Sequence, residues 1–142
     1  MSTSPSPGSI VLLTRLSRLV YKRATEDVLG MRLKAYVTLS NLREGPRSQQ
    51  DLCIAMHLDP NNCVLMLNDL ENDGYVERRR DPADRRRHIV ELTRAGHKAM
   101  LAAERAMESL EDDVLGALEP DEREVLRKLL ARALAAEPAL TP

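Results

Sequence analysis

The chain is poor in aromatic side chains: its 142 residues contain no Phe, no Trp and only three Tyr. Proteins that hold single-stranded nucleic acid usually stack its bases on aromatic rings, so this scarcity argues against that mode of binding. A chain of this length is long enough to bury a proper core, and here that core must be built from aliphatic residues.

Long apolar runs are also missing. None approaches the roughly 20 residues that a helix needs to span a bilayer. The first eight residues are rich in Ser and Pro and lack the basic start and the apolar stretch of a secretory signal. We therefore expect residues 1–8 to form a disordered tail and the protein to be cytoplasmic, with no membrane partner.

Cysteine is scarce as well. Cys53 and Cys63 do not make a disulfide framework, and in a reducing compartment they are expected to be buried free thiols. Cys53 and His57 lie four residues apart, a spacing that can serve zinc, but no third or fourth ligand is evident nearby. The sequence therefore predicts neither a metal site nor a cofactor.

Catalytic signatures are lacking too. There is no phosphate-cradling Gly loop and no constellation of acid, base and nucleophile. The acids after residue 94 alternate with bases at helical spacing, as on a solvated helix face. We do not expect an enzyme.

Helical patterns cover most of the chain. The first segment, 10–29, carries apolar residues at three- and four-residue steps and is closed by Gly30. Ser48 and the Asp59-Pro60 pair are strong helix starts. Further helices are predicted over residues 33–43, 48–57, 60–73, 93–118 and 121–136. The helices that begin at Ser48 and Pro60 are separated by three residues and form a helix-turn-helix.

A strongly basic hairpin follows. Residues 75–79 and 88–93 have strand character, and residues 78–87 between and beside them hold six Arg and two Asp in a chain of net charge −1. Such a tip beside a short helix suits a winged-helix DNA-binding protein, in which the helix enters the major groove and the tip reaches phosphates or the minor groove. The alternative is a solvated charge run. The predicted fold class is mainly α with a small β-hairpin wing: a winged helix-turn-helix with dimerisation helices at both ends.

Dimerisation is expected because the first helix and the last two have wide apolar faces that a small winged core cannot cover. Packing within one chain is the alternative. Palindromic DNA sites reward two-fold symmetry.

Several motifs together resemble the MarR family of bacterial transcriptional regulators. They are Leu29-Gly30-Met31, Gly45-Pro46-Arg47-Ser48, Leu70-Glu71-Asn72-Asp73-Gly74-Tyr75-Val76-Glu77-Arg78, Asp81-Pro82-Ala83-Asp84-Arg85-Arg86 and Leu92-Thr93-Arg94-Ala95-Gly96. The resemblance implies one domain over residues 9–137, with a DNA-binding lobe over 32–93 and dimerisation helices over 9–29 and 94–137. It also implies a homodimer that represses a palindromic promoter site and is released by a small-molecule effector.

The resemblance assigns roles to residues of the hairpin and of the helix before it. Arg86 matches the wing arginine that enters the minor groove, Asp84 the acid that orients it, and Arg85 and Arg87 flank them. The recognition helix would present Pro60, Asn61, Asn62, Val64, Leu65 and Asn68.

The recognition helix departs from the family pattern at two positions. The family often places a small hydroxyl residue and an Arg where this chain has Val64 and Leu65. Asparagine can bind adenine and Val64 can touch a thymine methyl, which favours A·T-rich half-sites. Asn61 and Asn62 are equally compatible with simple helix-start chemistry.

The signal that controls the protein is left open between two classes. A small molecule would bind in a cleft, for which Arg18, Tyr36 and Thr38 are candidate lining residues. The rival is a thiol-based redox sensor that uses Cys63 or Cys53. A winged helix used for protein contacts is a further alternative, which the wing arginines disfavour.

Overall fold

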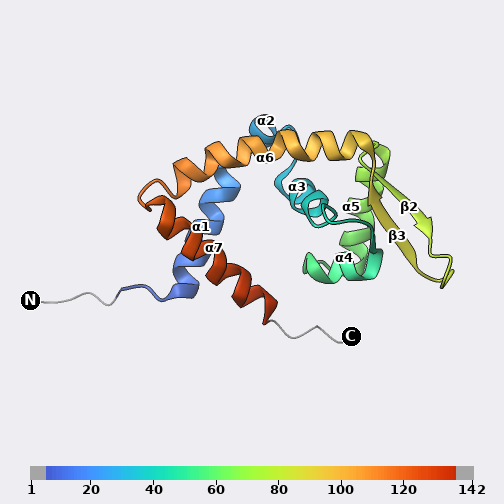
Figure 1. Ribbon diagram of the computed structural model, residues 1–142, viewed down its shortest axis with the longest axis horizontal. Helices are drawn as coiled ribbons and strands as arrows, with labels where there is room; N and C mark the ends of the chain where they lie inside the picture. Colours follow the sequence, from blue (N-terminus) through green and yellow to red (C-terminus); the bar gives the residue numbers. More distant parts are fainter. Residues whose placement is uncertain (1–5, 137–142) are drawn as a thin grey trace, which may run out of the picture.

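The computed structural model describes residues 6–136, and Figure 1 shows one long helix, α6, running along the molecule. At one end of α6 lies a lobe with the helix-turn-helix and a small sheet; at the other lie α1 and α7. The elements in chain order are α1 (Ser9–Arg23), α2 (Glu26–Leu29), α3 (Leu33–Ser40), β1 (Arg47–Ser48), α4 (Gln49–Ala55), α5 (Pro60–Asn72), β2 (Val76–Arg80), β3 (His88–Leu92), α6 (Arg94–Val114) and α7 (Pro120–Ala135). The expected tail over residues 1–8 lies largely outside the described residues.

The prediction of one helix over residues 10–29 is wrong, because the chain breaks after Arg23. Ala24 leaves the helical conformation and is almost fully buried, at 4% exposure. Thr25 is extended and begins the short helix α2, which Gly30 ends with φ of +79°. The apolar spacing continues across this corner, so periodicity alone did not reveal it.

The predicted helix-turn-helix is present with its expected caps. The Ser48 hydroxyl accepts a hydrogen bond from the Asp51 amide at 3.1 Å, and the Asp59 carboxylate accepts one from the Asn62 amide at 2.9 Å. His57, two residues after the end of α4, has a left-handed φ of 54°, which turns the chain towards α5. Each cap satisfies an amide that the first turn of a helix would otherwise leave unpaired.

The hairpin forms one edge of a three-stranded antiparallel sheet in the order β1-β3-β2. Strand β1 was not predicted, since two residues are too few to show an alternating pattern. Arg47 pairs with Val90 on one side of β3, and Arg78 pairs with Val90 on the other. Val76 and Val90 point into the core, while the tip extends beyond it.

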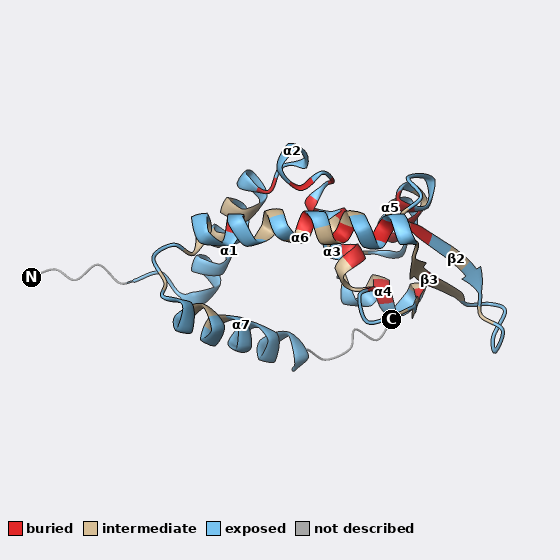
Figure 2. Cartoon of the chain, turned by 45° about the horizontal axis from the view of Figure 1, so that its top comes forward, coloured by how far each residue is buried: buried red, intermediate tan, exposed pale blue. Residues whose placement is uncertain are grey.

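The core is aliphatic, as the composition predicts, and it lies in the lobe. Leu39, Leu52, Val90 and Met100 have exposures of 0%. Figure 2 shows buried residues gathered around α3, α5 and the adjoining half of α6, whereas α1 and α7 are mostly exposed. Neither α1 nor α7 contains a fully buried residue, so the chain alone leaves both terminal helices largely uncovered.

The prediction of free thiols is wrong: Cys53 and Cys63 form a disulfide. The turn after α4 folds α5 back beside it, which places the two Cα atoms 5.7 Å apart, within the usual range for a disulfide. Cys63 points inward, as expected, with 2% exposure, while Cys53 is only half-buried. The sequence showed two cysteines ten residues apart but not that the faces carrying them would meet.

A brace of polar groups fastens β2 to α5. The Arg78 guanidinium donates to the Asn68 side-chain oxygen at 2.5 Å and to the Glu71 carboxylate at 3.1 Å. The Arg78 amide also donates to Glu71, at 3.1 Å. The hydrogen bond from the Arg78 side chain is the main reason that the pKa of Glu71 lies below its ordinary value.

This brace predicts a pH-dependent contribution to folding. Because the pKa of Glu71 is lowered in the folded state, its contribution is present above the unfolded-state pKa and is lost as pH falls through the folded pKa. The Glu71 side chain is 41% exposed, so we expect Glu71→Gln to lower the free energy of unfolding by only about 0.5 kcal/mol at pH 7. Urea denaturation should show this difference vanish in acid. Glu77→Gln, at an exposed position on β2, is the control; an equal effect there would contradict the assignment.

Gly96 predicts a larger effect. It lies in the first turn of α6, and a Cβ built there would stand 1.9 Å from the Tyr75 carbonyl oxygen. That neighbour is backbone and cannot swing aside, so Gly96→Ala should lower the free energy of unfolding by about 3 kcal/mol. Thermal denaturation measures this. Lys98→Ala, on the exposed side of the same helix, should change stability by less than about 0.5 kcal/mol, and equal stability of the two variants would refute the close approach.

Candidate nucleic-acid interface

The outer face of α5 gathers the residues predicted to read DNA. Val64 and Leu65 are 37% and 61% exposed, although both are apolar. Pro60, Asn61 and Asn62 are also exposed, whereas Asn68 is half-buried. The opposite side of α5 supplies Cys63, Leu67 and Leu70 to the core. One face of α5 therefore packs into the core, and the opposite face is exposed and available to DNA.

The three asparagines of this face differ in how far they are already engaged. The Asn62 side chain donates to the Asp59 carboxylate at 2.5 Å, which supports helix-start chemistry for this residue. The Asn68 oxygen accepts from Arg78 in the brace. The Asn61 side chain makes no hydrogen bond within residues 6–136 and is exposed, so it is the asparagine most available to a base edge.

The wing tip is held by hydrogen bonds between near neighbours. The Asp84 carboxylate accepts from the Arg86 amide at 3.1 Å, and the Asp84 carbonyl accepts from the Arg87 amide at 2.9 Å. The Arg80 guanidinium donates to the Arg85 carbonyl at 2.8 Å. Asp84 thus binds the backbone amide of Arg86 and not its guanidinium. It therefore orients the Arg86 side chain indirectly, by fixing the backbone from which that side chain extends.

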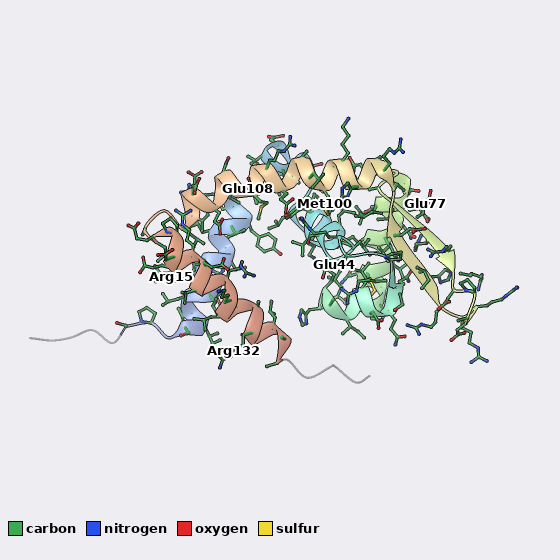
Figure 3. All side chains as sticks on the ribbon, viewed as in Figure 1. Arg15, Glu44, Glu77, Met100, Glu108 and Arg132 are labelled. Carbon is green, nitrogen blue, oxygen red and sulfur yellow. A yellow bond between two sulfur atoms is a disulfide. The ribbon has the colours of Figure 1, made fainter. Side chains whose placement is uncertain are left out.

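The wing arginines divide into engaged and available ones. Arg79 pairs with Glu91 at 3.1 Å within the hairpin, and Arg87 lies 3.9 Å from the Asp51 carboxylate. Among residues 6–136 the guanidinium groups of Arg85 and Arg86 make no ion pair. Figure 3 shows long side chains that extend outward from this tip. Exposed, unpaired guanidinium groups are suited to phosphate oxygens and to a narrow, negative groove.

A cavity of about 550 Å³ lies between the helix-turn-helix and the wing, and its walls are mostly apolar. Its lining includes the half-buried Cys53. The side-chain oxygen of Gln49, on the same wall, is buried and has no hydrogen-bond donor within the described part of the chain. The other lining residues are Ser48, Gln50, Ile54, His57, Leu58, Asp59, Pro60, Val64, Arg86, Arg87 and His88. Sequence reasoning did not find this cavity, because its walls come from three separate elements.

The structure does not bring the three candidate effector residues together. Arg18 is exposed on α1. Thr38 is 2% exposed, and its hydroxyl donates to the Lys34 carbonyl at 2.8 Å. Tyr36 alone lines a cavity, of about 670 Å³, between α1, α3, α6 and α7. Burial, and then the nearby Glu104 carboxylate, raise the pKa of the Tyr36 hydroxyl, with Arg43 acting in the opposite direction.

Most of the lining of this second cavity was missed. It is formed by Leu13, Leu16, Ser17, Val20, Tyr36, Glu104, Met107, Glu108, Leu110, Glu111, Val114, Leu115, Leu126, Arg127 and Leu130. In sequence the apolar members of this lining look like ordinary helix stripes, and only the packing of four helices shows that they surround a space.

Among residues 6–136, no helix is long and apolar enough to cross a membrane. No group of three or more His, Cys, Asp or Glu side chains gathers there as metal ligands would. The Cys53 sulfur, considered with His57 as a zinc pair, is committed to the disulfide instead.

Comparison with known proteins gives a consistent result. A sequence profile of the MarR family matches residues 33–88. The transcriptional regulator HosA of Escherichia coli O111:H- is 39% identical over 69 residues, which cover 49% of this chain and 51% of HosA. The uncharacterised HTH-type transcriptional regulator Mb0904 of Mycobacterium bovis is 31% identical over 114 residues, covering 80% of this chain and 78% of that protein. The chain thus spans about half the length of HosA and over three quarters of Mb0904.

Solved structures share the fold over nearly the whole chain. The crystal structure of MarR matches with a TM-score of 0.79 at 27% identity, covering 94% of this chain and 92% of that one. The PcaV regulator from Streptomyces coelicolor, solved in complex with its natural ligand, matches with a TM-score of 0.73. It is 22% identical and covers 96% of this chain and 99% of that one, a likeness that shows the fold alone.

The predicted resemblance is therefore confirmed on three grounds: the family profile over the helix-turn-helix and wing, a relative matched along most of its length, and a shared winged-helix fold. The chain belongs to the MarR family of winged helix-turn-helix transcriptional regulators, which bind DNA.

Proposed function

We propose that the protein is a cytoplasmic homodimer that represses transcription from a palindromic promoter site and that a small-molecule effector releases it from the DNA. The observation that carries this proposal is the pairing of an exposed α5 face with a wing whose tip is ordered by Asp84 and whose Arg86 guanidinium is unpaired. The two features lie on neighbouring elements, so α5 would enter the major groove of a duplex while the wing enters the adjacent minor groove.

Contacts to DNA would divide between positioning and reading. Arg85, Arg86 and Arg87 supply positive charge to phosphates and to the minor groove, which raises affinity for any sequence. Asn61 and Val64 face the major groove from the first two turns of α5. An asparagine amide pairs with adenine and a valine methyl packs on a thymine methyl, so we propose an A·T-biased half-site.

The dimer would form through the terminal helices. The first turns of α1 expose Ile10, Val11, Leu12 and Leu13 by 42% to 74%, and α7 exposes Val125, Leu129, Leu130 and Leu134 by 38% to 66%. Apolar surface of this extent on two neighbouring helices is stabilised by burial against a second copy. A two-fold dimer presents two α5 helices and two wings, which is the symmetry of a palindrome.

The effector would occupy the cavity lined by Tyr36. This cavity lies beside α6, the helix that joins the lobe to α1 and α7, so its occupant contacts the elements that set the distance between two lobes. The PcaV regulator, a structural neighbour, holds its natural ligand. By analogy, we propose that a ligand also controls this chain. The walls are mostly apolar and also carry the Tyr36 phenol, three glutamates and Arg127, which favours a small, mostly apolar compound with a polar group near Tyr36.

A second candidate signal is the oxidation state of Cys53 and Cys63. The disulfide between them favours it, because disulfides of cytosolic proteins are usually redox-active. Oxidation of the cysteines and binding of an effector could both occur in one molecule, because they involve separate sites. Cys53 lines the cavity beside the wing, and Tyr36 lines the cavity between α1, α3, α6 and α7.

The dimer is tested by charging the exposed face of α7. Leu129→Glu combined with Leu134→Glu should convert the dimer into a monomer at micromolar concentration, because two carboxylates would be buried in an apolar interface. Sedimentation velocity gives the mass. Lys128→Glu combined with Arg132→Glu changes charge on the same helix without removing apolar surface and serves as the control. A wild-type chain that sediments as a monomer and still binds its operator with full affinity would refute the proposal.

The wing is tested by two single substitutions. Arg86→Ala should weaken operator binding by about 1–3 kcal/mol per half-site and reduce its salt dependence. Asp84→Ala should also weaken binding, although it removes a negative charge near DNA, because the Arg86 amide loses its acceptor. Fluorescence anisotropy with a duplex selected by the protein from a random pool measures both.

Arg105→Ala, an exposed position on α6, is the matched control for loss of one positive charge. It should leave operator affinity nearly unchanged. Tighter binding by Asp84→Ala would show that the tip is only a charged loop and would overturn the orienting role of Asp84.

A further inference from the structure

The disulfide ties together the two helices of the helix-turn-helix. Cys53 lies on α4 and Cys63 on α5, on either side of the turn at His57. A protein that acts on chromosomal DNA works in a compartment rich in reduced thiols, where an accessible disulfide undergoes exchange. Whether this bond is accessible depends on its two sulfur atoms separately.

The two cysteines differ in access. Cys63 is 2% exposed and belongs to the hydrophobic core with Leu67 and Leu70. Cys53 is half-buried and lines the cavity of about 550 Å³ beside the wing. A molecule that enters this cavity meets Cys53, whereas Cys63 lies behind it. Attack on the bond should therefore fall on the Cys53 sulfur.

The cavity also selects by charge. Arg86 and Arg87 line it from the wing, where residues 78–87 hold six Arg and two Asp. Within the described residues its lining contains one carboxylate, that of Asp59, and Arg87 lies 3.9 Å from the Asp51 carboxylate outside the lining. Positive charge therefore predominates on the wing side, so an anion is attracted to the opening and a cation is repelled.

We propose that Cys53 is a thiol–disulfide exchange site that small anionic thiols reach through this cavity, and that bound operator DNA closes the route. The closure rests on the proposed function, because Val64 and Arg86 belong both to the cavity wall and to the surfaces that would face DNA. The site at Cys53 and its charge preference do not depend on DNA binding.

The exchange proceeds in two balanced steps. The thiolate RS⁻ attacks the Cys53 sulfur; a new R–S–S–Cys53 bond forms, the Cys53–Cys63 bond breaks, and Cys63 leaves as a thiolate that takes a proton from water. A second RS⁻ attacks the sulfur that R contributed to the mixed disulfide; the R–S–S–R bond forms, the bond to Cys53 breaks, and Cys53 leaves as a thiolate that also takes a proton from water. Two thiols are oxidised to one disulfide and the protein gains two electrons and two protons. The loss of the bond removes the side-chain cross-link between α4 and α5.

The charge preference is tested with two thiols of similar size. Mercaptoethanesulfonate is anionic and cysteamine is cationic; each rate of reduction is divided by the rate of the same thiol on an unstructured peptide disulfide. We expect the anionic thiol to be favoured about tenfold, and the preference to fall at high salt. Arg86→Gln combined with Arg87→Gln should abolish it, whereas Arg105→Gln should keep it. Equal normalised rates in the wild-type protein would overturn the proposal.

The point of attack is tested by trapping. The first mixed disulfide is quenched with acid and located by peptide mass. The thiol should be found on Cys53 in at least about tenfold excess over Cys63, which reacts only after local opening of the core. A mixed disulfide found mainly on Cys63 would refute the assignment, and this measurement needs no variant that might fail to fold.

The effect of DNA separates this inference from the proposed function. Reduction by mercaptoethanesulfonate is followed with and without a saturating duplex selected by the protein, and with an equal charge of heparin. The duplex should slow reduction by about tenfold and heparin by less. If anisotropy shows the duplex bound but reduction is not slowed, the closure is wrong while the function stands. If no duplex is selected or bound, the proposed function fails and the closure with it; the charge preference and the trapping result still decide the exchange site.

Discussion

The packing of α6 against the lobe is the contact on which the rest of the structure depends. Met100 and Ala103 of α6 are both fully buried, and Gly96 passes so close to the Tyr75 carbonyl that no side chain fits between them. The Thr93 hydroxyl accepts from the Gly96 amide and donates to the Gly74 carbonyl at 2.6 Å. The start of α6 is thereby fixed to the end of α5 and to the base of the wing.

Through this attachment the lobe, with its small sheet and short helices, is joined rigidly to the terminal helices α1 and α7. Towards its C-terminal end α6 leaves the lobe and meets α1 and α7, neither of which contains a fully buried residue. One continuous helix is stiff over this length, so a change in how α1 and α7 pack is transmitted to the orientation of the lobe. In the proposed function, this is the mechanical path from the cavity at Tyr36 to α5 and the wing.

The disulfide lies in the DNA-binding lobe, at the other end of α6 from α1 and α7. It lies within the helix-turn-helix, beside the surface that would face DNA, and it restrains α5 directly rather than through α6. An effector at Tyr36 would alter the spacing of two lobes, whereas cleavage of the sulfur bond would loosen one lobe. The brace from Arg78 to Asn68 and Glu71 holds the end of α5 that lies away from the disulfide.

Local chemistry in the sequence determined the caps, the turn and the hairpin. Ser48, Asp59 and Thr93 each cap a helix with the hydrogen bond that their side chains predict, and the basic tip lies where the strand pattern put it. The caps depend on residues three positions apart, and the hairpin depends on two strand segments joined by a short tip, so a linear pattern contains them. The family motifs extended the prediction to the whole fold. The corner at Ala24 and the two-residue strand β1 escaped it, because burial and pairing with a distant segment create them.

The disulfide and the lining of the two cavities could be known only from the tertiary structure, because they depend on which helix faces meet. The sequence shows that both Cys53 and Cys63 are present, but their disulfide requires α5 to fold back beside α4 with the two cysteines on facing sides of the helices. Arg18, Tyr36 and Thr38 are all polar groups on helices with apolar faces, yet each faces a different environment: Arg18 lies exposed on α1, whereas Tyr36 and Thr38 lie two positions apart on different faces of α3. Short-range hydrogen bonds follow from sequence order; the relative rotation of packed helices follows from the summed contacts of residues far apart in the chain.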